Sequence, residues 1–140
     1  MVRNSDLKII RILQENSRTP FLRIAKALGV SEAAVRKRVK KLEREGVIKR
    51  YTIEVNPVKL GFEIVAFIGV DTRPEYYIPT LETLKDLDEV VSLYSSSGDH
   101  MMLLECWFKT SEELADFVRR LNSMEGVTRV CPAIILKKLK

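Results

Sequence analysis

The chain has 140 residues, 46% of them hydrophobic and 31% charged, so it is long enough to bury one medium core or two small ones. Its formal net charge is +5, and no apolar run approaches the roughly 20 residues that a bilayer-spanning helix needs. The start "MVRNSDLKII" lacks the apolar centre and cleavage site of a signal peptide, so we expect a cytoplasmic protein with no membrane partner.

The first predicted element is a helix over "SDLKIIRILQEN". Either Asn4 or Ser5 is available to cap its start. Its apolar side chains recur at helical spacing and form a stripe that should face a core. The stripe consists of Leu7, Ile10 and Leu13, widened by Ile9 and Ile12.

The segment "RTPFLRIAKALGV" predicts a second helix. Thr19 is the expected N-cap and Pro20 the first helical residue, because proline suits that position. Gly29 is expected to end the helix. The apolar positions are Phe21, Ile24, Ala25 and Leu28, which follow the i, i+3, i+4, i+7 pattern.

A third helix is predicted over "SEAAVRKRVKKLEREG". Ser31 can cap the N–H groups at its start, and Gly46 can take the left-handed conformation that ends it. Val35, Val39 and Leu42 fall on one face, and basic side chains occupy the rest of the surface.

The connection between the second and third helices indicates a helix-turn-helix. Only Val30 separates Gly29 from the cap Ser31, so the two helices must cross steeply, and the small Ala25 permits their close approach. Residues 1–55 hold 14 Lys and Arg against 6 Asp and Glu, a formal charge of +8, whereas residues 56–140 hold 10 against 13, a charge of −3. A three-helix bundle with a solvated basic face is the plainer alternative, but caps, turn spacing and charge together favour binding to double-stranded DNA.

A third helix lying in the major groove would present its exposed residues to the DNA. Arg36 is the strongest candidate for a bidentate contact with guanine. Arg38 lies on the flank, where an ion pair with an acid such as Glu45 and a DNA contact are both open. The residues expected at base edges are Glu32, Ala33, Arg36, Lys37 and Lys40. Those expected at phosphate oxygens are Arg18, Arg23, Ser31, Lys41 and Arg44.

Tyr51, Ile53 and Val55 alternate with polar residues and predict one strand, either part of a wing or paired with a partner subunit. The segment "NPVKLGF" that follows has the proline and glycine of a linker. We therefore expect a DNA-binding domain over residues 1–55, a linker over 56–62 and a second domain over 63–140.

The second domain shows the order β-α-β-β-α-β. Strands are predicted at "EIVAFIGVDT", "EVVSLYSSS", "HMMLLECWFK" and "VTRVCPAIILKKL", and helices at "PEYYIPTLETLKDL" and "SEELADFVRRLNSM". Pro79 places the start of the first helix near Ile78, and Ser111 is the expected cap of the second. The two isolated cysteines, Cys106 and Cys131, form no CxxC motif and are expected as buried thiols.

A faint internal repeat supports this order. The segments "LKDLDEVVSL" and "LNSMEGVTRV" align as a helix end, a short acidic turn and a strand. Two such units give an antiparallel sheet with both helices on one face, which is the ferredoxin-like arrangement of an α+β protein. The other sheet face would be apolar and uncovered, which predicts a dimer that buries sheet against sheet.

With these motifs in order, the sequence resembles the Lrp/AsnC family of prokaryotic regulators, the feast/famine proteins, and its archaeal members most. The resemblance covers the N-terminal half from "DLKIIRILQEN" to "VNPVKLGF" and the later segments "SSSGDHMMLLECWFKTSEELADFV" and "MEGVTRV". It implies a transcription regulator that dimerises through the C-terminal domain, assembles into tetramers or octamers, binds pseudo-palindromic promoter sites and regulates its own promoter.

The resemblance also implies a small effector, often an amino acid, bound near one loop. The matching residues are Ser96, Ser97, Gly98, Asp99 and His100. Where the family often has an aromatic residue and a second carboxylate after its glycine-aspartate pair, this chain has His100 and Met101, which leaves the effector specificity open. Asp99 is interpreted either as an effector contact or as a turn residue bonded to its own backbone, and His100 as a turn or interface residue.

Two other functions remain as alternatives. An architectural protein could bind DNA through phosphates alone, without an effector. A decarboxylase could be built on a similar two-domain frame, although the chain has a single histidine and no nucleophile-base constellation. We expect no enzyme activity, no catalytic residues, no cofactor and no metal, since no ligand set accompanies His100.

Overall fold

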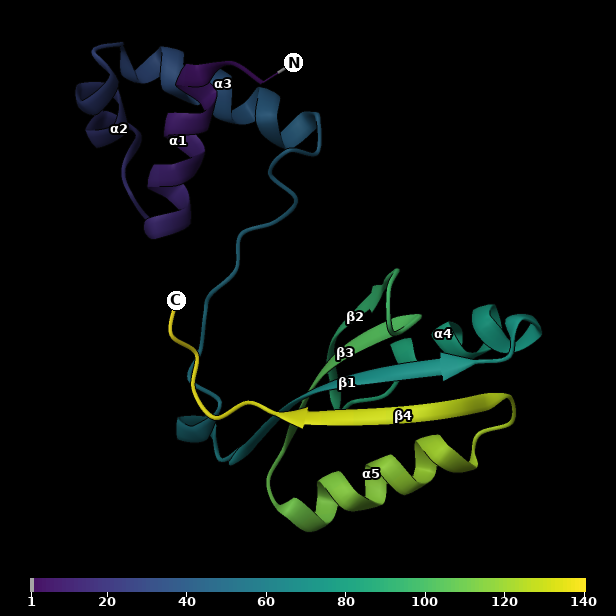
Figure 1. The fold of residues 1–140 in the computed structure, drawn as a ribbon. Coiled ribbons are helices and arrows are strands. Elements are labelled where there is room, and N and C mark those ends of the chain that lie inside the picture. Colours follow the sequence, from purple (N-terminus) through teal and green to yellow (C-terminus); the bar gives the residue numbers. More distant parts are fainter. Residues whose placement is uncertain (1) are drawn as a thin grey trace. The chain divides into compact units, whose positions relative to one another are not determined.

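The computed structural model describes residues 2–140 and divides into two compact units, one ending at Glu54 and the other comprising Val55–Lys140 (Figure 1). Among the described residues, the first unit contains three α-helices, and the second contains a four-stranded sheet with two α-helices. The predicted α+β class, a helix-turn-helix followed by a ferredoxin-like arrangement, is confirmed.

The helices of the first unit are α1 (Asn4–Glu15), α2 (Phe21–Leu28) and α3 (Glu32–Arg44). In α1 the core residue is Ile9, which is fully buried, whereas Leu7 is 44% exposed. Of the predicted stripe, Ile9, Ile12 and Leu13 face the core and Leu7 does not, because packing against α2 and α3 selects one line of the apolar surface. The shared core consists of Ile9, Ile24, Ala25, Val35 and Val39.

The ends of α2 and α3 follow the predicted signals. Gly29 and Gly46 adopt φ angles of +68° and +74°, the left-handed conformation in which glycine is favoured. The hydroxyl of Ser31 accepts a hydrogen bond from the Ala34 N–H at 3.1 Å and so caps α3. Together these ends confirm the short turn between α2 and α3.

The predicted starts of α1 and α2 were wrong. Arg3 is the N-cap of α1, and its backbone N–H donates to the Asp6 carboxylate at 3.1 Å. Pro20, in an extended conformation, is the N-cap of α2, and the Thr19 hydroxyl donates instead to the Asn16 carbonyl at 2.7 Å. At α1 the bond from the Arg3 N–H to Asp6 places the cap one residue before Asn4, and at α2 the Thr19 hydroxyl turns back to Asn16 instead of forward to the helix.

The predicted strand at residues 51–55 does not form within residues 2–140. Tyr51 is 52% exposed and Ile53 is 81% exposed, so their alternation faces no core. A strand needs a neighbouring strand to satisfy its ladder hydrogen bonds, and this segment has none within the described part of the chain.

The second unit begins with a short 3₁₀ turn, η1 (Val58–Leu60), and then β1 (Ile64–Thr72), a second 3₁₀ turn η2 (Pro74–Tyr76) and α4 (Tyr77–Lys85). It continues through β2 (Val90–Ser95), β3 (Met102–Phe108), α5 (Ser111–Ser123) and β4 (Val127–Ile134). The sheet has the order β2-β3-β1-β4, and every neighbouring pair is antiparallel (Figure 1). Helix α5 is capped by Thr110, whose hydroxyl accepts from the Glu113 N–H at 3.2 Å, and not by Ser111.

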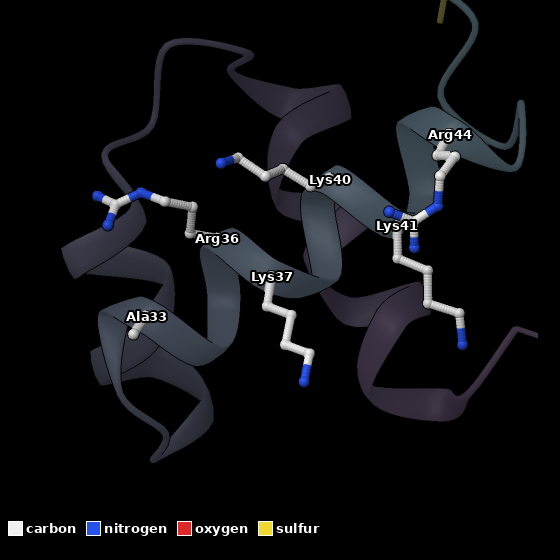
Figure 2. A pocket seen from close by; sticks show the side chains of 6 residues that line it. All are labelled: Ala33, Arg36, Lys37, Lys40, Lys41 and Arg44. Atoms are coloured by element: carbon white, nitrogen blue, oxygen red, sulfur yellow. The ribbon is translucent and has the colours of Figure 1, made fainter.

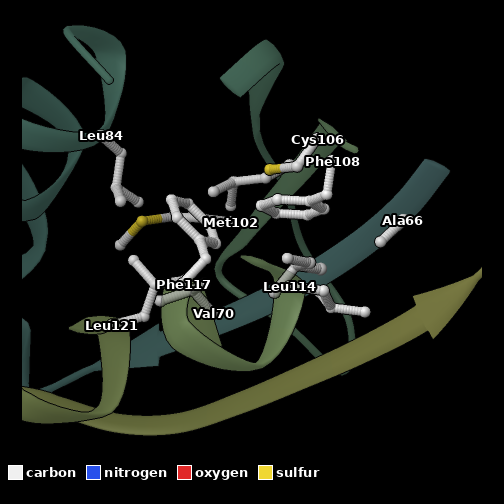
Figure 3. Close-up of a cluster of buried hydrophobic side chains, with 11 residues drawn as sticks. Ala66, Val70, Leu84, Met102, Cys106, Phe108, Leu114, Phe117 and Leu121 are labelled. Carbon is white, nitrogen blue, oxygen red and sulfur yellow. The ribbon is translucent and has the colours of Figure 1, made fainter. Parts of the chain in front are cut away.

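Both helices cover the same face of the sheet. Alternate residues of β1 and β3 point into this core, where Phe108 and Phe117 pack with ring centroids 5.3 Å apart (Figure 3). Burial raises the pKa of the Cys106 thiol to about 12, which keeps it protonated and unreactive. Cys131 is only half-buried, so the prediction of a buried thiol holds for Cys106 alone. The core residues are Ala66, Ile68, Val70, Leu84, Met102, Leu104, Cys106, Phe108, Leu114, Phe117 and Leu121.

The opposite sheet face is uncovered in the single chain. Phe67 lies between core residues of β1 and is 38% exposed, and Leu103 of β3 is 36% exposed. Tyr94 pairs with Leu103 across β2 and β3 and is exposed as well. We call Phe67, Tyr94 and Leu103 the open-face apolar residues. Within residues 2–140, none of the helices combines the length and the apolar composition required to cross a bilayer.

Candidate nucleic-acid interface and effector loop

Helix α3 separates apolar and basic side chains on opposite sides. Val35, Val39 and Leu42 are buried against the rest of the first unit. The outward side carries a hollow, which we call the basic hollow, with five cationic side chains and one alanine (Figure 2). Its lining residues are Ala33, Arg36, Lys37, Lys40, Lys41 and Arg44. A surface with this many cations and no acid in its lining attracts an anion.

The cations of the basic hollow leave the helix in two directions. Arg36 and Lys40 extend toward one side of α3, and Lys37 and Lys41 toward the other (Figure 2). The small side chain of Ala33 lies on the same surface and leaves room near the start of the helix. Six of the ten predicted DNA-contacting residues are therefore brought together on one surface.

Arg36 already has partners in the free protein. Its Nη2 donates to the Glu32 carboxylate at 2.7 Å, and its guanidinium carbon lies 5.9 Å from the centroid of the Phe21 ring. Both members of the ion pair are nearly half exposed. An exposed pair of this kind contributes only about 0–1 kcal/mol, so DNA can replace it at little cost.

The remaining predicted contacts lie outside the basic hollow. Arg18 and Arg23 are exposed near the start of α2. The Ser31 oxygen accepts the capping bond, which leaves its hydroxyl hydrogen available to donate. Glu32 lies beside the hollow as the partner of Arg36. The Lys41 ammonium is 3.9 Å from the Glu45 carboxylate, so the acid at position 45 pairs with Lys41 and not with Arg38.

The predicted effector loop, residues 96–100, connects β2 to β3. The Ser96 N–H donates to the Met101 carbonyl at 2.9 Å, and the Ser96 hydroxyl donates to the His100 carbonyl at 2.7 Å. Gly98 has a φ angle of +94°, which few residues other than glycine adopt. These bonds close the hairpin and hold the loop in one conformation.

Two residues that the sequence analysis missed, Asp71 and Arg129, anchor this loop. Asp71 is the one charged residue of β1, and its side chain is only 15% exposed. One carboxylate oxygen accepts from the Met101 N–H at 2.9 Å, and the other accepts from His100 Nδ1 and Arg129 Nε, each at 2.9 Å. Burial alone raises the pKa of Asp71, but the hydrogen bonds from His100, Met101 and Arg129 outweigh it and the pKa is lowered.

Arg129 also fixes the tip of the loop. Its Nη2 donates to the Asp99 carbonyl at 2.6 Å and to the Asp99 carboxylate at 3.0 Å. The carboxylate of Asp99 is thus bonded to Arg129 and not to its own backbone as one interpretation had it. His100 lies between Asp71 and Asp99, with Nε2 3.4 Å from the Asp99 carboxylate. We call Asp71, Asp99, His100 and Arg129 the Asp71 cluster.

The imidazole of His100 lies directly over Gly69 of β1. A β-carbon built at Gly69 would come within 2.3 Å of the His100 ring, so only glycine fits beneath it.

A lone charged residue in an otherwise apolar strand was the available signal for Asp71, but its partner Arg129 lies 58 residues away in the sequence. Among residues 2–140, no group of three or more His, Cys, Asp or Glu side chains is placed to hold a metal ion.

Two family models match the chain. The model described as winged helix-turn-helix DNA-binding matches residues 3–49, and the model described as Lrp/AsnC ligand binding domain matches residues 65–140. These ranges coincide with the unit that carries the basic hollow and the unit that carries the Asp71 cluster.

Individual proteins match over the full length. The chain is 52% identical to the HTH-type transcriptional regulator LrpA of Pyrococcus horikoshii, with all of both chains covered. It is 42% identical to the HTH-type transcriptional regulator Ptr1 of Methanocaldococcus jannaschii, covering all of this chain and 95% of that protein.

Solved structures share the arrangement. Escherichia coli AsnC superposes with a TM-score of 0.87 at 26% identity, with 100% of this chain and 95% of that chain covered. A transcriptional regulator of Neisseria meningitidis in complex with L-Met gives a TM-score of 0.90 at 26% identity, with 100% and 93% covered.

The substitution Asp71→Asn tests the anchoring role of the Asp71 carboxylate. Because the carboxylate accepts three hydrogen bonds, two of them from side chains that carry or can carry positive charge, we expect a loss of about 1–3 kcal/mol of unfolding free energy at pH 7. The pKa of Asp71 is lowered from an ordinary value of 3.8, so the carboxylate stabilises the fold above that pH. The advantage of wild type over Asp71→Asn should therefore shrink as the pH falls through 3.8 and below, measured by urea unfolding at several pH values.

Asp99→Asn is the matched control, because the Asp99 side chain is 80% exposed, and it should cost less unfolding free energy. A pH-independent difference between wild type and Asp71→Asn would contradict the anchoring role.

Proposed function

The chain belongs to the Lrp/AsnC family of HTH-type transcriptional regulators and is not an enzyme, and we propose that it binds pseudo-palindromic promoter sites, its own among them, with sequence preference. In this proposal it acts in the cytoplasm as a dimer or a higher oligomer, a tetramer or octamer, under the control of an amino-acid effector. It needs no cofactor.

The observation that carries the proposal is the basic hollow on α3. A helix whose apolar stripe is fixed in a core and whose outer surface is lined by five cations matches the recognition helix of a helix-turn-helix. Long basic side chains reach both phosphates and base edges, and guanine offers two acceptors to an arginine. Arg36, released from Glu32, supplies such a bidentate donor.

The open face of the sheet supports a dimer. The open-face apolar residues lie outside the core of the single chain, and burying them against a second copy removes apolar surface from water. A two-fold dimer presents two copies of α3, which fits a pseudo-palindromic site with half-sites about one helical turn apart.

An amino-acid effector is supported by the loop at residues 96–100. A related regulator, 26% identical, has been solved in complex with L-Met. In this chain the Asp99 carboxylate already holds Arg129, so the α-ammonium group of an effector must share or displace that guanidinium. Such an exchange would release Arg129 from the loop, so that effector binding would act directly on β4, the strand that carries Arg129.

Selection of fragmented genomic DNA by the purified protein, with and without a mixture of common amino acids, tests the function as a whole. We expect enrichment of a palindromic motif that the mixture alters, because specific contacts add to the phosphate attraction. Enrichment that ignores the mixture would remove the effector from the proposal. Uniform recovery would favour an architectural protein, and failure to bind any DNA would contradict the proposal.

Arg36→Ala tests direct readout by α3. We expect binding to the selected site to weaken by about 1–3 kcal/mol and base preference to relax at one position, because a bidentate contact with guanine is lost. Binding measured by fluorescence anisotropy on all four base variants of each position would locate the effect. An equal loss on random DNA would show that Arg36 contacts only phosphates.

Lys41→Ala and Arg44→Ala are the matched controls on the same surface. Both should weaken binding to every sequence similarly and make the log–log salt dependence shallower by about one unit, as expected for a lost phosphate contact. A base-dependent effect of either substitution would show that the rotation of α3 in the groove differs from the one proposed.

Phe67→Asp tests the sheet-to-sheet dimer. A charge among the open-face apolar residues must lose its hydration in that interface, so we expect the dimer to dissociate into folded monomers in sedimentation experiments. Ile78→Asp is the control, since Ile78 is an exposed apolar residue on α4. Dissociation by the control and not by Phe67→Asp would place the dimer interface elsewhere.

A further inference from the structure

A second cavity lies between the start of α1 and the flank of α3. It has a volume of about 370 Å³ and shares Lys37 and Lys41 with the basic hollow, so the two cavities are neighbours along α3. We call it the α1–α3 cavity. Its ionisable lining consists of Arg3, Lys37, Arg38 and Lys41, with Asp6 and Glu45 as the acids.

The two acids of this cavity have other partners. The Asp6 carboxylate accepts from the Arg3 backbone N–H at 3.1 Å, and the Glu45 carboxylate lies 3.9 Å from the Lys41 ammonium. Arg38 is left over. Its Nη1 is buried and has no hydrogen-bond partner among residues 2–140. A buried cationic donor without an acceptor is costly, and an anion entering the cavity would supply the missing bond.

The geometry of a helix in the major groove indicates which anion would reach Arg38. An α-helix with its side chains is about 10–12 Å across, and the major groove is about 12 Å wide, so a recognition helix lies between two phosphate backbones. Arg36 and Arg38 are two residues apart, a rotation of about 200° around α3, so their side chains leave the helix in directions about 160° apart. Arg36 faces Phe21 of α2, whereas Arg38 lines the cavity beside α1. Arg38, on the flank of α3 beside α1, is thus suited to the wall of the groove on that side.

We propose that the α1–α3 cavity is a phosphate site, in which Arg38, assisted by Arg3, donates to one backbone phosphate of the bound duplex on the α1 side of α3. The site rests on the proposed DNA binding and deepens it. Arg38 is a positioning residue, because a phosphate contact carries no base information but sets the rotation of α3 in the groove. A guanidinium suits this role, since its planar donors match phosphate oxygens.

The test combines Arg38→Met with duplexes that carry one uncharged methylphosphonate at a time. Methionine keeps an apolar stem in place of the arginine stem and removes the donors. We expect Arg38→Met to bind every sequence about tenfold more weakly and to show a salt dependence shallower by about one unit. One methylphosphonate position should weaken wild type by a similar factor and leave Arg38→Met without further loss. Lys40→Met, in the basic hollow and outside the cavity, is the matched control and should remain sensitive at that position.

The outcomes separate the two proposals. Wild type that binds no duplex overturns DNA binding itself. Wild type that binds, with Arg38→Met and wild type equally sensitive to every methylphosphonate, overturns the phosphate site alone. Thermal unfolding shows whether Arg38→Met is folded, and if it is not, Arg3→Met provides the same comparison, because Arg3 is exposed. We expect a methylphosphonate at that same phosphate position to weaken binding by Arg3→Met less than binding by wild type. Equal weakening of the two proteins there would overturn the site.

Discussion

The burial of one apolar stripe on α3 is the constraint on which the DNA interface depends. Val35, Val39 and Leu42 are at most 3% exposed, and a rigid helix cannot bury this line without turning the opposite line outward. The six basic side chains of α3 could not take the buried positions, because an unpaired charge in a core is far more costly than an exposed one. Packing therefore decides the rotation of the helix, and the rotation decides which cations face a ligand.

In the second unit, too, burying one line of side chains turns the others outward, here with the two-residue period of a strand. Ala66, Ile68 and Val70 point into the core, so Gly69 and Asp71 must point to the other face of β1. The register between β1 and β4 then places Arg129 directly opposite Asp71. The cost of burying most of the Asp71 carboxylate is offset by three donors, and the loop at residues 96–100 is held to the sheet as a result. Strand register thus decides where the loop is anchored, while Ser96 and Gly98 determine its own conformation.

Features with a local cause could be predicted from the sequence, and features with a distant cause could not. Gly29, Ser31 and Gly46 act within one turn of the backbone, so their roles were visible in the order of the letters. The choice of Ile9 over Leu7 as core residue depends on where α2 and α3 lie.

The same distinction applies to the sites. The pairing of Asp71 with Arg129 exists only after β1 and β4 have paired in one register, and the free nitrogen of Arg38 depends on Glu45 pairing with Lys41 instead. The basic hollow was predictable because its residues share a single helix, whereas the role of the loop at residues 96–100 rested on the family resemblance and stays a prediction. The alternation at residues 51–55 wrongly predicted a strand, because a strand pattern forms no strand without a neighbouring strand.

The separation of the two sites on two units bears on how an effector could act on DNA binding. In our proposal, an effector bound at the loop of the second unit acts on DNA binding by altering the state of the assembly that presents α3. In a two-fold dimer the second α3 binds at an effective concentration set by the spacing of the two helices, and a small change in that spacing alters the affinity of the pair without changing either contact. By linkage, DNA that favours one spacing must alter the affinity for the effector by the same factor. The proposal thus assigns base preference to α3, and the response to an effector to the loop, Arg129 and the open face of the sheet.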